Sequence, residues 1–481
     1  MSAPTRNDEA ELDIERLNSE AQGVARRDGF VWFVVGAMPG ERVRARVIKP
    51  GARSCVARVM RIVEPSPDRV EPPCPVYVRC GGCAAQHMAY GATLDWKAGV
   101  VRDCLERIGG IRSPLVRPTV GMEQPWRYRN KGAFPVAGKV GSAVIGCYAP
   151  RSHEVIDAPD GCALHKRETN LLVEAVRGWM KENRVEPYDE ARHEGLVRRI
   201  VTRVNRDGKS MLTIVVREAQ AARLPGLDAL VRGLREAGAG LEGVAVSRNP
   251  SRGNAVFGPE CRAVWGVESL EERLELSVGA LSYYLSPRSF FQVNTRQAER
   301  LAETVLGYVR GAGGSGAAAD VYCGAGTLTL ALAKAGFEAV GVELVEDAVR
   351  DARRNAVANG LAGVRFEQGD AAVSMPELVR KYGRFDVIVM DPPRKGCDRA
   401  VLEAAARAGP SRVVYVSCDP ATLARDAATL AGLGYQLEEA TPIDQFCWTA
   451  SIETVALFRH GGTTYPGHEG PASRWSGGQG G

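Results

Sequence analysis

The sequence lacks any apolar stretch long enough to cross a membrane. A membrane helix needs about 18 or more uninterrupted apolar residues, and the most apolar segments here are broken by charged residues such as Asp320 and Lys334. An apolar secretory leader is also missing, because the N-terminal residues MSAPTRNDEAELDIERLN are polar and mostly acidic. These absences argue against membrane and secreted proteins, and we expect a cytoplasmic location.

A large excess of charge of one sign is missing as well. The 62 Lys and Arg residues against 57 Asp and Glu residues give a net charge of +5 in 481 residues, which by itself identifies no nucleic-acid partner. Hydrophobic residues make up 45% and charged residues 25%, values that exclude a mainly disordered or fibrous chain. We find no internal repeat, and the length predicts roughly two to four domains.

The N-terminal residues 11–64 predict a small β-barrel, because short strand-like stretches alternate with Gly and Pro turns. The segment from Arg42 to Val47 alternates strictly, which places three arginines on one face of a strand and aliphatic side chains on the other. Only Glu41 opposes this positive charge, which continues in Lys49, Arg53, Arg58 and Arg61. A solvated strand face is one interpretation; we favour contact with an RNA backbone.

Aromatic and cationic residues interleave at residues 126–131, as they do on surfaces that stack bases and bind phosphates. Core aromatics beside surface arginines explain the same pattern equally well. Residues 195–285 mix apolar strands, such as Met211 to Val216, with an Ala- and Leu-rich helix near 220–237. We expect a second, α+β region there and find no chemistry in it.

The twelve cysteines predict metal binding, catalysis or burial, because a reducing compartment does not support a disulfide framework. Cys74, Cys80 and Cys83 form a tight cluster, and the glycines at 81 and 82 let the backbone turn around a metal. Tetrahedral zinc with His87 as a fourth ligand is one interpretation of this cluster.

Beyond a flexible segment at residues 311–316, strands and helices alternate, which predicts a parallel sheet. We expect its strands at residues 318–322, 339–343, 364–368, 385–390, 412–417 and 452–458. The Gly-rich residues 461–481 contain almost no aliphatic side chains, so we expect a disordered tail.

The first strand of this sheet leads into the turn from Tyr322 to Thr327, where glycines allow close approach of backbone to a ligand. Glu343, at the end of the next strand, is expected to accept hydrogen bonds from ribose hydroxyls. Both features fit NAD or S-adenosylmethionine. The fourth strand ends in Asp391-Pro392-Pro393-Arg394, which favours a methyltransferase acting on nucleobases or amides, with Asp370 near the adenine or sugar.

Cys418 follows the fifth strand on the same sheet edge, and the Asp-Pro turn after it is expected to expose the thiol. A cysteine there is a candidate nucleophile, although a lone cysteine is often a small buried hydrophobe. Glu453 stands among apolar residues of the last strand, where proton abstraction would explain an acidic side chain.

Together these residues resemble the RNA (uracil-5-)-methyltransferases, and they are most similar to the iron–sulfur enzymes acting on 23S ribosomal RNA. The resemblance covers nearly the whole chain. It rests on the motifs Ser289-Phe290-Phe291-Gln292-Val293-Asn294, Tyr322 to Thr327, Asp391 to Arg394, Ser417-Cys418-Asp419-Pro420 and the terminal Glu453. This chain departs from the family in having Cys447, Ser451 and Asp419 where proline, histidine and asparagine are usual.

The resemblance implies a Rossmann-like C-terminal sheet that binds S-adenosylmethionine, and a basic N-terminal barrel that is a TRAM or OB-like domain binding RNA. It implies Cys418 as the nucleophile and Glu453 as the base. It also implies that Cys162 completes a four-cysteine set for a 4Fe–4S cluster with a structural or RNA-orienting role. The side chains that would line the cofactor and target site are Gln292, Tyr322, Thr327, Glu343, Asp370 and Asp391.

The expected chemistry explains these residue types. Carbon 5 of uracil is a weak nucleophile, so a Cys418 thiolate adds first at carbon 6 and raises the electron density at carbon 5. Carbon 5 then takes the methyl group, Glu453 removes the carbon 5 proton, and the thiol is eliminated. A paired base is inaccessible to such an attack, so the uridine must be flipped out or unpaired.

We expect four segments: a TRAM or OB-like barrel at 8–65, a central α+β domain with the cysteine cluster at 66–285, the methyltransferase domain at 286–460 and the tail at 461–481. The expected partner is RNA, with ribosomal RNA favoured over transfer RNA, and neither DNA nor a membrane; a monomer is the default. The alternatives are an amino-group methyltransferase, in which Cys418 is idle, and a non-catalytic iron–sulfur RNA-binding protein.

Overall fold

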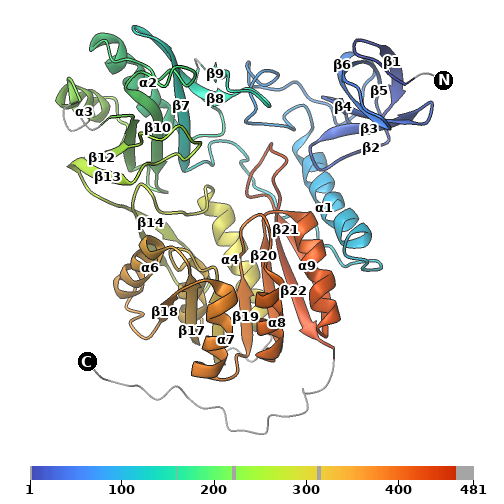
Figure 1. The fold of residues 1–481 in the computed structure, drawn as a ribbon, viewed down its shortest axis with the longest axis vertical. Coiled ribbons are helices and arrows are strands. Elements are labelled where there is room, and N and C mark those ends of the chain that lie inside the picture. The colour runs from blue at the N-terminus through green and yellow to red at the C-terminus, as the bar shows by residue number, and fades with distance from the viewer. Residues whose placement is uncertain (1–2, 159, 219–223, 311–315, 462–481) are drawn as a thin grey trace.

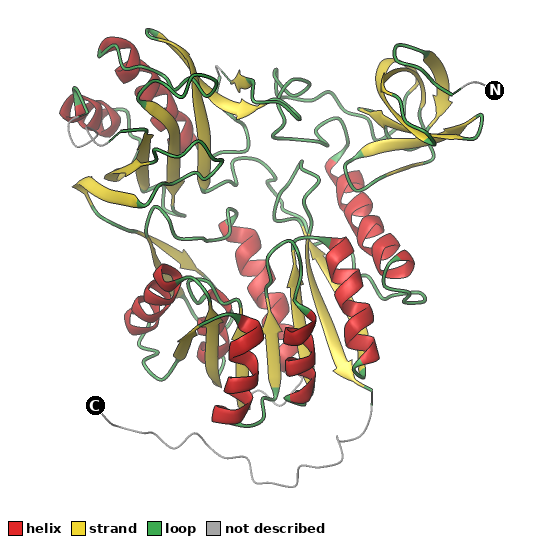
Figure 2. Ribbon diagram, in the orientation of Figure 1, coloured by secondary structure: helices red, strands yellow, loops and turns green. Residues whose placement is uncertain are grey.

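The computed structural model describes residues 3–158, 160–218, 224–310 and 316–461 (Figure 1). It contains an N-terminal barrel, a central sheet with two helices, and a C-terminal sheet covered by helices on both faces (Figure 2). The described helices include none with both the length and the apolarity needed to span a bilayer. The expected linker at 311–316 and tail at 461–481 fall, except for Gly316 and Gly461, outside the described residues.

The N-terminal barrel is a six-stranded sheet in the order β1-β5-β6-β4-β3-β2. Alternate residues of β5 are buried, as the sequence predicts, and Val43, Ala45 and Val47 form part of the barrel core. Its strands are β1 (Glu9–Asp13), β2 (Arg16–Leu17), β3 (Gln22–Arg27), β4 (Phe30–Val35), β5 (Arg42–Lys49) and β6 (Ser54–Glu64).

The arginine face of β5 is not an unopposed positive surface, which corrects the sequence-based expectation. Arg44 and Arg46 both form ion pairs with Glu9, each at 2.7 Å. Arg42 pairs with Asp13 at 2.9 Å and with Glu64 at 3.1 Å. The acidic partners come from β1 and from the end of β6, and strand pairing brings them opposite β5. Direct RNA contact by these three arginines therefore competes with intramolecular ion pairs.

The single acidic residue that the sequence places against the arginines, Glu41, is buried and turned elsewhere. Its carboxylate accepts hydrogen bonds from Arg69 and from the backbone N–H of Met38. Arg58 and Arg61 of β6 stand opposite Arg46 and Arg44, are exposed, and form no ion pair within the described ranges. These two side chains are the better candidates for contact with an RNA backbone.

Helix α1 (Tyr90–Arg107) follows the barrel and packs against α9 (Pro420–Gly432) and β21 (Tyr435–Ile443) of the C-terminal domain (Figure 1). The central sheet has the order β13-β12-β11-β10-β7-β8-β9. Its elements are β7 (Lys131–Lys139), β8 (Ser142–Tyr148), β9 (Val155–Asp157), α2 (Arg167–Glu182), β10 (Val197–Val204), β11 (Ser210–Val216), α3 (Leu227–Glu236), β12 (Leu241–Arg248) and β13 (Glu260–Gly266).

A two-stranded sheet of β14 (Leu270–Leu274) and β15 (Leu281–Leu285) leads to the C-terminal sheet, whose order is β18-β17-β16-β19-β20-β22-β21. Helices α4, α5 and α6 cover one face, and α7, α8 and α9 cover the other. The elements are α4 (Thr295–Arg310), β16 (Gly316–Val321), α5 (Thr327–Lys334), β17 (Phe337–Glu343), α6 (Glu346–Ala358), β18 (Arg365–Gln368), α7 (Ala371–Tyr382), β19 (Val387–Met390), α8 (Arg399–Arg407), β20 (Arg412–Ser417), α9 (Pro420–Gly432), β21 (Tyr435–Ile443) and β22 (Glu453–His460).

The expected parallel sheet is only partly parallel. All six predicted strands exist, but β22 runs antiparallel to β20. The seventh strand, β21, was not predicted from the sequence and pairs antiparallel with β22 at the edge of the sheet. Its residues include two glutamates in succession and Pro442, a composition that an edge strand tolerates and a central strand does not. From β16 the chain first adds β17 and β18 on one side of the sheet and then adds β19 and β20 on the other side. Sheets of this type bind ligands at the point between the two sides, here between β16 and β19.

Candidate active site

A cavity of about 790 Å³ opens at the carboxyl ends of β16, β17 and β19. Parallel strands end at one edge of a sheet, so side chains that follow different strands converge there. All eight residues that the sequence predicts for the cofactor and catalytic site line this one cavity. They are Gln292, Tyr322, Thr327, Glu343, Asp370, Asp391, Cys418 and Glu453.

The turn after β16 brings backbone to the floor of this cavity. Gly324 and Gly326 have φ values of 54° and 85°, and Tyr322 adopts φ of 70°, a conformation that non-glycine residues rarely take and that concentrates at functional sites. The Glu343 carboxylate accepts hydrogen bonds from the N–H of Gly324 at 3.0 Å and of Val345 at 2.9 Å. Glu343 therefore fixes the turn as well as facing the cavity.

Two further carboxylates shape the cavity. Asp370 caps the start of α7, since its Oδ1 accepts a hydrogen bond from the N–H of Ala372 at 2.8 Å. Burial and then the neighbouring Asp320 carboxylate raise the pKa of Asp391 to about 7. Asp320 is itself buried and accepts a hydrogen bond from Thr329 at 2.6 Å. The site thus concentrates acidic groups whose ionisation burial disfavours, and a ligand with a positive centre would favour their charged forms.

Cys418 directly follows β20, Glu453 begins the neighbouring strand β22, and both face the same cavity. Ser417, the last residue of β20, stands opposite Thr454 of β22, so Cys418 and Glu453 are the next positions at the edge. Cys418 is half-buried, whereas Glu453 is only 4% exposed. The turn that the sequence predicts after Cys418 is present, because the Asp419 carboxylate caps α9 through the N–H groups of Ala421 and Thr422.

Electrostatics link this pair. Burial, followed by the carboxylates of Glu453 and Asp391, raises the pKa of the Cys418 thiol to about 11, and the Arg394 guanidinium opposes the rise. Burial and then Asp391 also raise the pKa of Glu453 well above its ordinary value, again opposed by Arg394. A carboxylate with a raised pKa is a stronger base, and a thiol beside carboxylates stays protonated until cationic charge stabilises its thiolate.

The structure adds residues that sequence reasoning missed. Phe290 and Phe446 line the cavity, and the Phe290 side chain is 68% exposed. The Ser289 hydroxyl donates to the Asp351 carboxylate at 2.5 Å, and both residues line the cavity too. The sequence offered one signal, the aromatic pair in the motif from Ser289 to Asn294, because an exposed aromatic ring beside a cavity can stack on a base.

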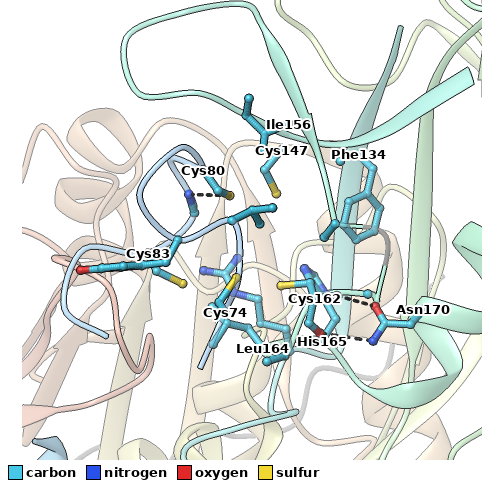
Figure 3. A pocket seen from close by; sticks show the side chains of 18 of the residues that line it. Cys74, Cys80, Cys83, Phe134, Cys147, Ile156, Cys162, Leu164, His165 and Asn170 are labelled. Atoms are coloured by element: carbon cyan, nitrogen blue, oxygen red, sulfur yellow. Dashed lines mark hydrogen bonds between the residues drawn. The ribbon is translucent and has the colours of Figure 1, made fainter. Parts of the chain in front are cut away.

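A second cavity, of about 920 Å³, lies on the other side of the loop that carries Phe446 and Ser451, and it contains the cysteine cluster. Figure 3 shows cysteine side chains arranged around one space. The four cysteines that the resemblance selects all line it, together with a fifth, Cys147, that belongs neither to the sequence cluster nor to the set implied by the resemblance. The set is Cys74, Cys80, Cys83, Cys147 and Cys162.

Cys147 reaches this cavity from β8 and interacts with Cys80. Its thiol donates a hydrogen bond that lowers the pKa of Cys80 to about 6. Both sulfur atoms lie close to Gly82, where an added Cβ would be 3.4 Å from the Cys80 Sγ and 3.9 Å from the Cys147 Sγ. No sequence spacing connects Cys147 to the cluster, because strand β8 brings it there from a separate part of the chain.

The zinc interpretation of the cluster is not supported. His87 does not line the cysteine cavity, and its Nδ1 hydrogen-bonds to the Tyr77 hydroxyl at 2.7 Å. Within the described ranges, no three His, Cys, Asp or Glu side chains are arranged to bind a single metal ion. Several buried polar atoms around the cavity nevertheless lack a hydrogen-bond partner, namely Gln86 Oε1, Arg129 Nε and His165 Nδ1.

Comparison with known proteins identifies both the C-terminal part of the chain, which contains the first cavity, and the N-terminal barrel. The tRNA (Uracil-5-)-methyltransferase family matches residues 260–460, and the TRAM domain matches residues 5–59. An uncharacterized RNA methyltransferase of Halalkalibacterium halodurans is 42% identical over 453 residues, covering 94% of this chain and 97% of the relative. Another, from Clostridium tetani, is 37% identical over 458 residues, covering 95% and 97%.

A solved structure resembles nearly the whole molecule. The crystal structure of Pyrococcus abyssi tRNA (uracil-54, C5)-methyltransferase in complex with S-adenosyl-L-homocysteine has a TM-score of 0.73 and 26% sequence identity. The match covers 93% of this chain and all of that one. The cavity at the carboxyl edge of the sheet and the two family matches therefore lead to one assignment. The chain belongs to the tRNA (uracil-5-)-methyltransferase family, as an S-adenosylmethionine-dependent RNA methyltransferase with an N-terminal TRAM domain.

Proposed function

We propose that this enzyme methylates carbon 5 of a specific uridine in RNA through a covalent adduct between Cys418 and carbon 6, with 23S ribosomal RNA as the favoured substrate. The observation that carries the proposal is the adjacency of Cys418 and Glu453 at the edge of one cofactor cavity. A methyltransferase that acts on an exocyclic nitrogen needs no such pair, because nitrogen attacks the methyl group directly.

Each step has a group to perform it. The Cys418 thiolate adds to carbon 6, and the resulting enolate attacks the methyl carbon of S-adenosylmethionine, which leaves as S-adenosylhomocysteine. Glu453 takes the proton from carbon 5, the electrons of that bond form the 5,6 double bond, and the thiolate leaves carbon 6. The raised pKa of Glu453 supports its role as the base, since it strengthens the carboxylate as a proton acceptor.

The substrate uridine must be unpaired or flipped out to enter the cavity. Phe290 and Phe446 offer aromatic rings for stacking at its mouth, a contact worth about 1–3 kcal/mol per base. Transfer RNA is the alternative substrate, because the P. abyssi relative is named for uracil 54 of tRNA. The four-cysteine set favours ribosomal RNA through the resemblance to the iron–sulfur enzymes.

A trapping experiment tests the proposal. We expect purified protein, S-adenosylmethionine and 5-fluorouridine-substituted ribosomal RNA to give a covalent complex on a denaturing gel, because fluorine cannot leave carbon 5 as a proton does. Cys418→Ala should give no complex, whereas Cys104→Ala, a half-buried thiol outside both cavities, should behave like the wild type.

The RNA that is trapped identifies the substrate. A complex with transfer RNA alone would replace ribosomal RNA in the proposal. No complex with either RNA, from protein that binds S-adenosylmethionine, would contradict the adduct mechanism. It would favour methylation of an exocyclic amino group that Asp391, Pro392 and Pro393 hold.

We further propose that Cys74, Cys80, Cys83 and Cys162 hold a 4Fe–4S cluster. In such a cluster each thiolate binds a different iron atom, so the four sulfur atoms need not converge on one point as they would around zinc. The cysteine-lined cavity and its unpartnered buried polar atoms support a bound group there. With four protein ligands, the cluster would supply structural support, and orientation of RNA, but no open iron for chemistry.

The fifth cysteine makes this ligand set testable. Cys162→Ser is expected to lose the cluster, seen as loss of brown colour and of bound iron, whereas Cys147→Ser should retain about four irons per chain. The two variants are matched, because both replace a cysteine of the same cavity by its oxygen analogue. Retention of iron by Cys162→Ser together with loss by Cys147→Ser would assign the fourth ligand to Cys147.

We also propose a separate role for each part of the chain. Residues 8–65 would contact RNA, residues 66–285 would hold the cluster, and residues 286–460 would perform catalysis, followed by a tail at 461–481. We place the protein, as a monomer, in the reducing cytoplasm, where free thiols persist.

A further inference from the structure

One buried lysine outside the cavity is hydrogen-bonded to the loop that precedes Glu453. Lys97 belongs to α1, and its side chain is only 1% exposed. Its ammonium donates hydrogen bonds to Asp444 Oδ1 at 2.6 Å, to the Phe446 carbonyl at 3.0 Å and to the Ser451 carbonyl at 3.0 Å. These three bonds use every N–H of the ammonium, and all end in the loop of residues 444–452 that joins β21 to β22.

Asp444, the carboxylate partner of Lys97, is fixed by two side chains of α1. Asp444 is fully buried, and its second carboxylate oxygen accepts a hydrogen bond from the Tyr90 hydroxyl at 2.7 Å. Tyr90 and Lys97 lie two turns apart on α1 and so share one helix face. The Asp444 N–H donates to the Val120 carbonyl at 3.0 Å. One face of α1 therefore fixes the start of the loop.

The loop in turn shapes the site. Phe446 and Ser451 line the cofactor cavity, and Glu453 follows Ser451 by two residues. Lys97 binds the backbone near both ends of the loop, so it sets the separation between the Phe446 ring and the start of β22. A buried charge pair costs desolvation free energy that good packing would avoid. A positional role for the pair explains why the chain retains it.

We propose that Lys97 is a positioning residue for the reaction: by tying Asp444, Phe446 and Ser451 together from α1, it holds Glu453 where it can take the proton from carbon 5. The inference rests on the proposed function, since it assigns Lys97 to the step that Glu453 performs. Lys97 does not line the cavity and touches neither cofactor nor substrate. Its effect on the reaction passes through the loop.

The test separates positioning from general stability. Lys97→Met removes the N–H donors of the ammonium but leaves the buried Asp444 carboxylate without its cation. The test variant is therefore Lys97→Met with Asp444→Asn, which leaves no uncompensated buried charge. The matched control is Arg117→Met, which breaks another cation–carboxylate pair to β21, with Glu439, away from the loop.

We expect the test variant to bind S-adenosylmethionine, and to trap fluorouridine RNA at saturation, within about threefold of the wild type, because Cys418 is undisturbed. Release of methylated RNA should slow by roughly 10- to 100-fold, the usual effect of misplacing a catalytic group by about 1 Å. With ordinary uridine RNA, the covalent complex should then accumulate. Amide hydrogen exchange of residues 444–452 should also accelerate, whereas Arg117→Met should change none of these measurements.

The contrary outcomes are distinct. If release stays at the wild-type rate, or if binding, trapping and release all fall together, Lys97 is merely structural and the inference is wrong, while the proposed function stands. If the wild type itself forms no adduct with fluorouridine RNA, the proposed function fails and the role of Lys97 in it falls too. Exchange of the loop then still reports whether Lys97 orders it.

Discussion

Replacing Glu453 by glutamine is expected to produce an enzyme that methylates its uridine once and then remains attached to the RNA. Glutamine has the same shape but accepts no proton at carbon 5, so the methylated adduct cannot eliminate the Cys418 thiolate. Steady-state turnover should fall by about 10²- to 10⁴-fold, the range for loss of a general base. A single round of methyl incorporation should persist, because it precedes the step that needs Glu453.

The measurement uses ordinary RNA and labelled S-adenosylmethionine. Under denaturing conditions the methyl label should migrate with a protein–RNA complex in Glu453→Gln and with free RNA in the wild type. Glu439→Gln is the matched control, since Glu439 is a β21 carboxylate that does not line the cavity. Normal turnover of Glu453→Gln would assign the base to another group, and Asp391 is then the next candidate because its pKa is raised to about 7.

The catalytic edge was predictable from the sequence because its information is local. An apolar strand followed by a turn motif places the next side chain at the carboxyl edge of a parallel sheet, whatever the rest of the chain does. Asp391 and Cys418 could be placed in this way, and the structure brings both to one cavity with Glu453. Glu453 begins β22 and reaches this edge because β22 runs antiparallel to β20, a direction that the sequence did not predict. The shifted pKa values of all three could not be predicted, since these depend on burial and on charges from several strands.

Pairings between distant segments were not predictable. Lys97 reads in sequence as one more polar position of a helix, and only the packing of α1 beside β21 brings its ammonium to Asp444. The same holds for Cys147, which a strand carries into the cysteine cavity, and for Glu9, whose strand pairs it with the β5 arginines. In each case, tertiary contacts decide the partner, and sequence separation carries no signal of it.

The rate of covalent attack is expected to rise steeply with pH. The pKa of the Cys418 thiol is raised to about 11 by burial and by the carboxylates of Glu453 and Asp391. Below that pKa the fraction of thiolate increases about tenfold per pH unit, and the thiolate is the attacking species. Between about pH 6 and 8, trapping of fluorouridine RNA should therefore accelerate by roughly 10- to 100-fold, with the smaller value to the extent that Asp391, whose pKa is raised to about 7, ionises over this range and adds negative charge beside the thiol.

Arg394 is expected to increase the rate of adduct formation at every pH. Its guanidinium is the cation that opposes the rise in the thiol pKa, so Arg394→Met should slow trapping at every pH, by about three- to tenfold, without changing the slope. The measurement is the single-turnover rate of adduct formation at RNA concentrations that saturate both proteins, with S-adenosylmethionine affinity as the control.

A plateau above about pH 7 in the wild type would contradict attack by a thiolate formed in solution. It would mean that the thiol proton passes to a group of lower pKa within the site, and Asp391, with its pKa of about 7, has the appropriate value. The profile thus decides whether the negative charge around Cys418 only suppresses the thiolate or also provides the acceptor for its proton.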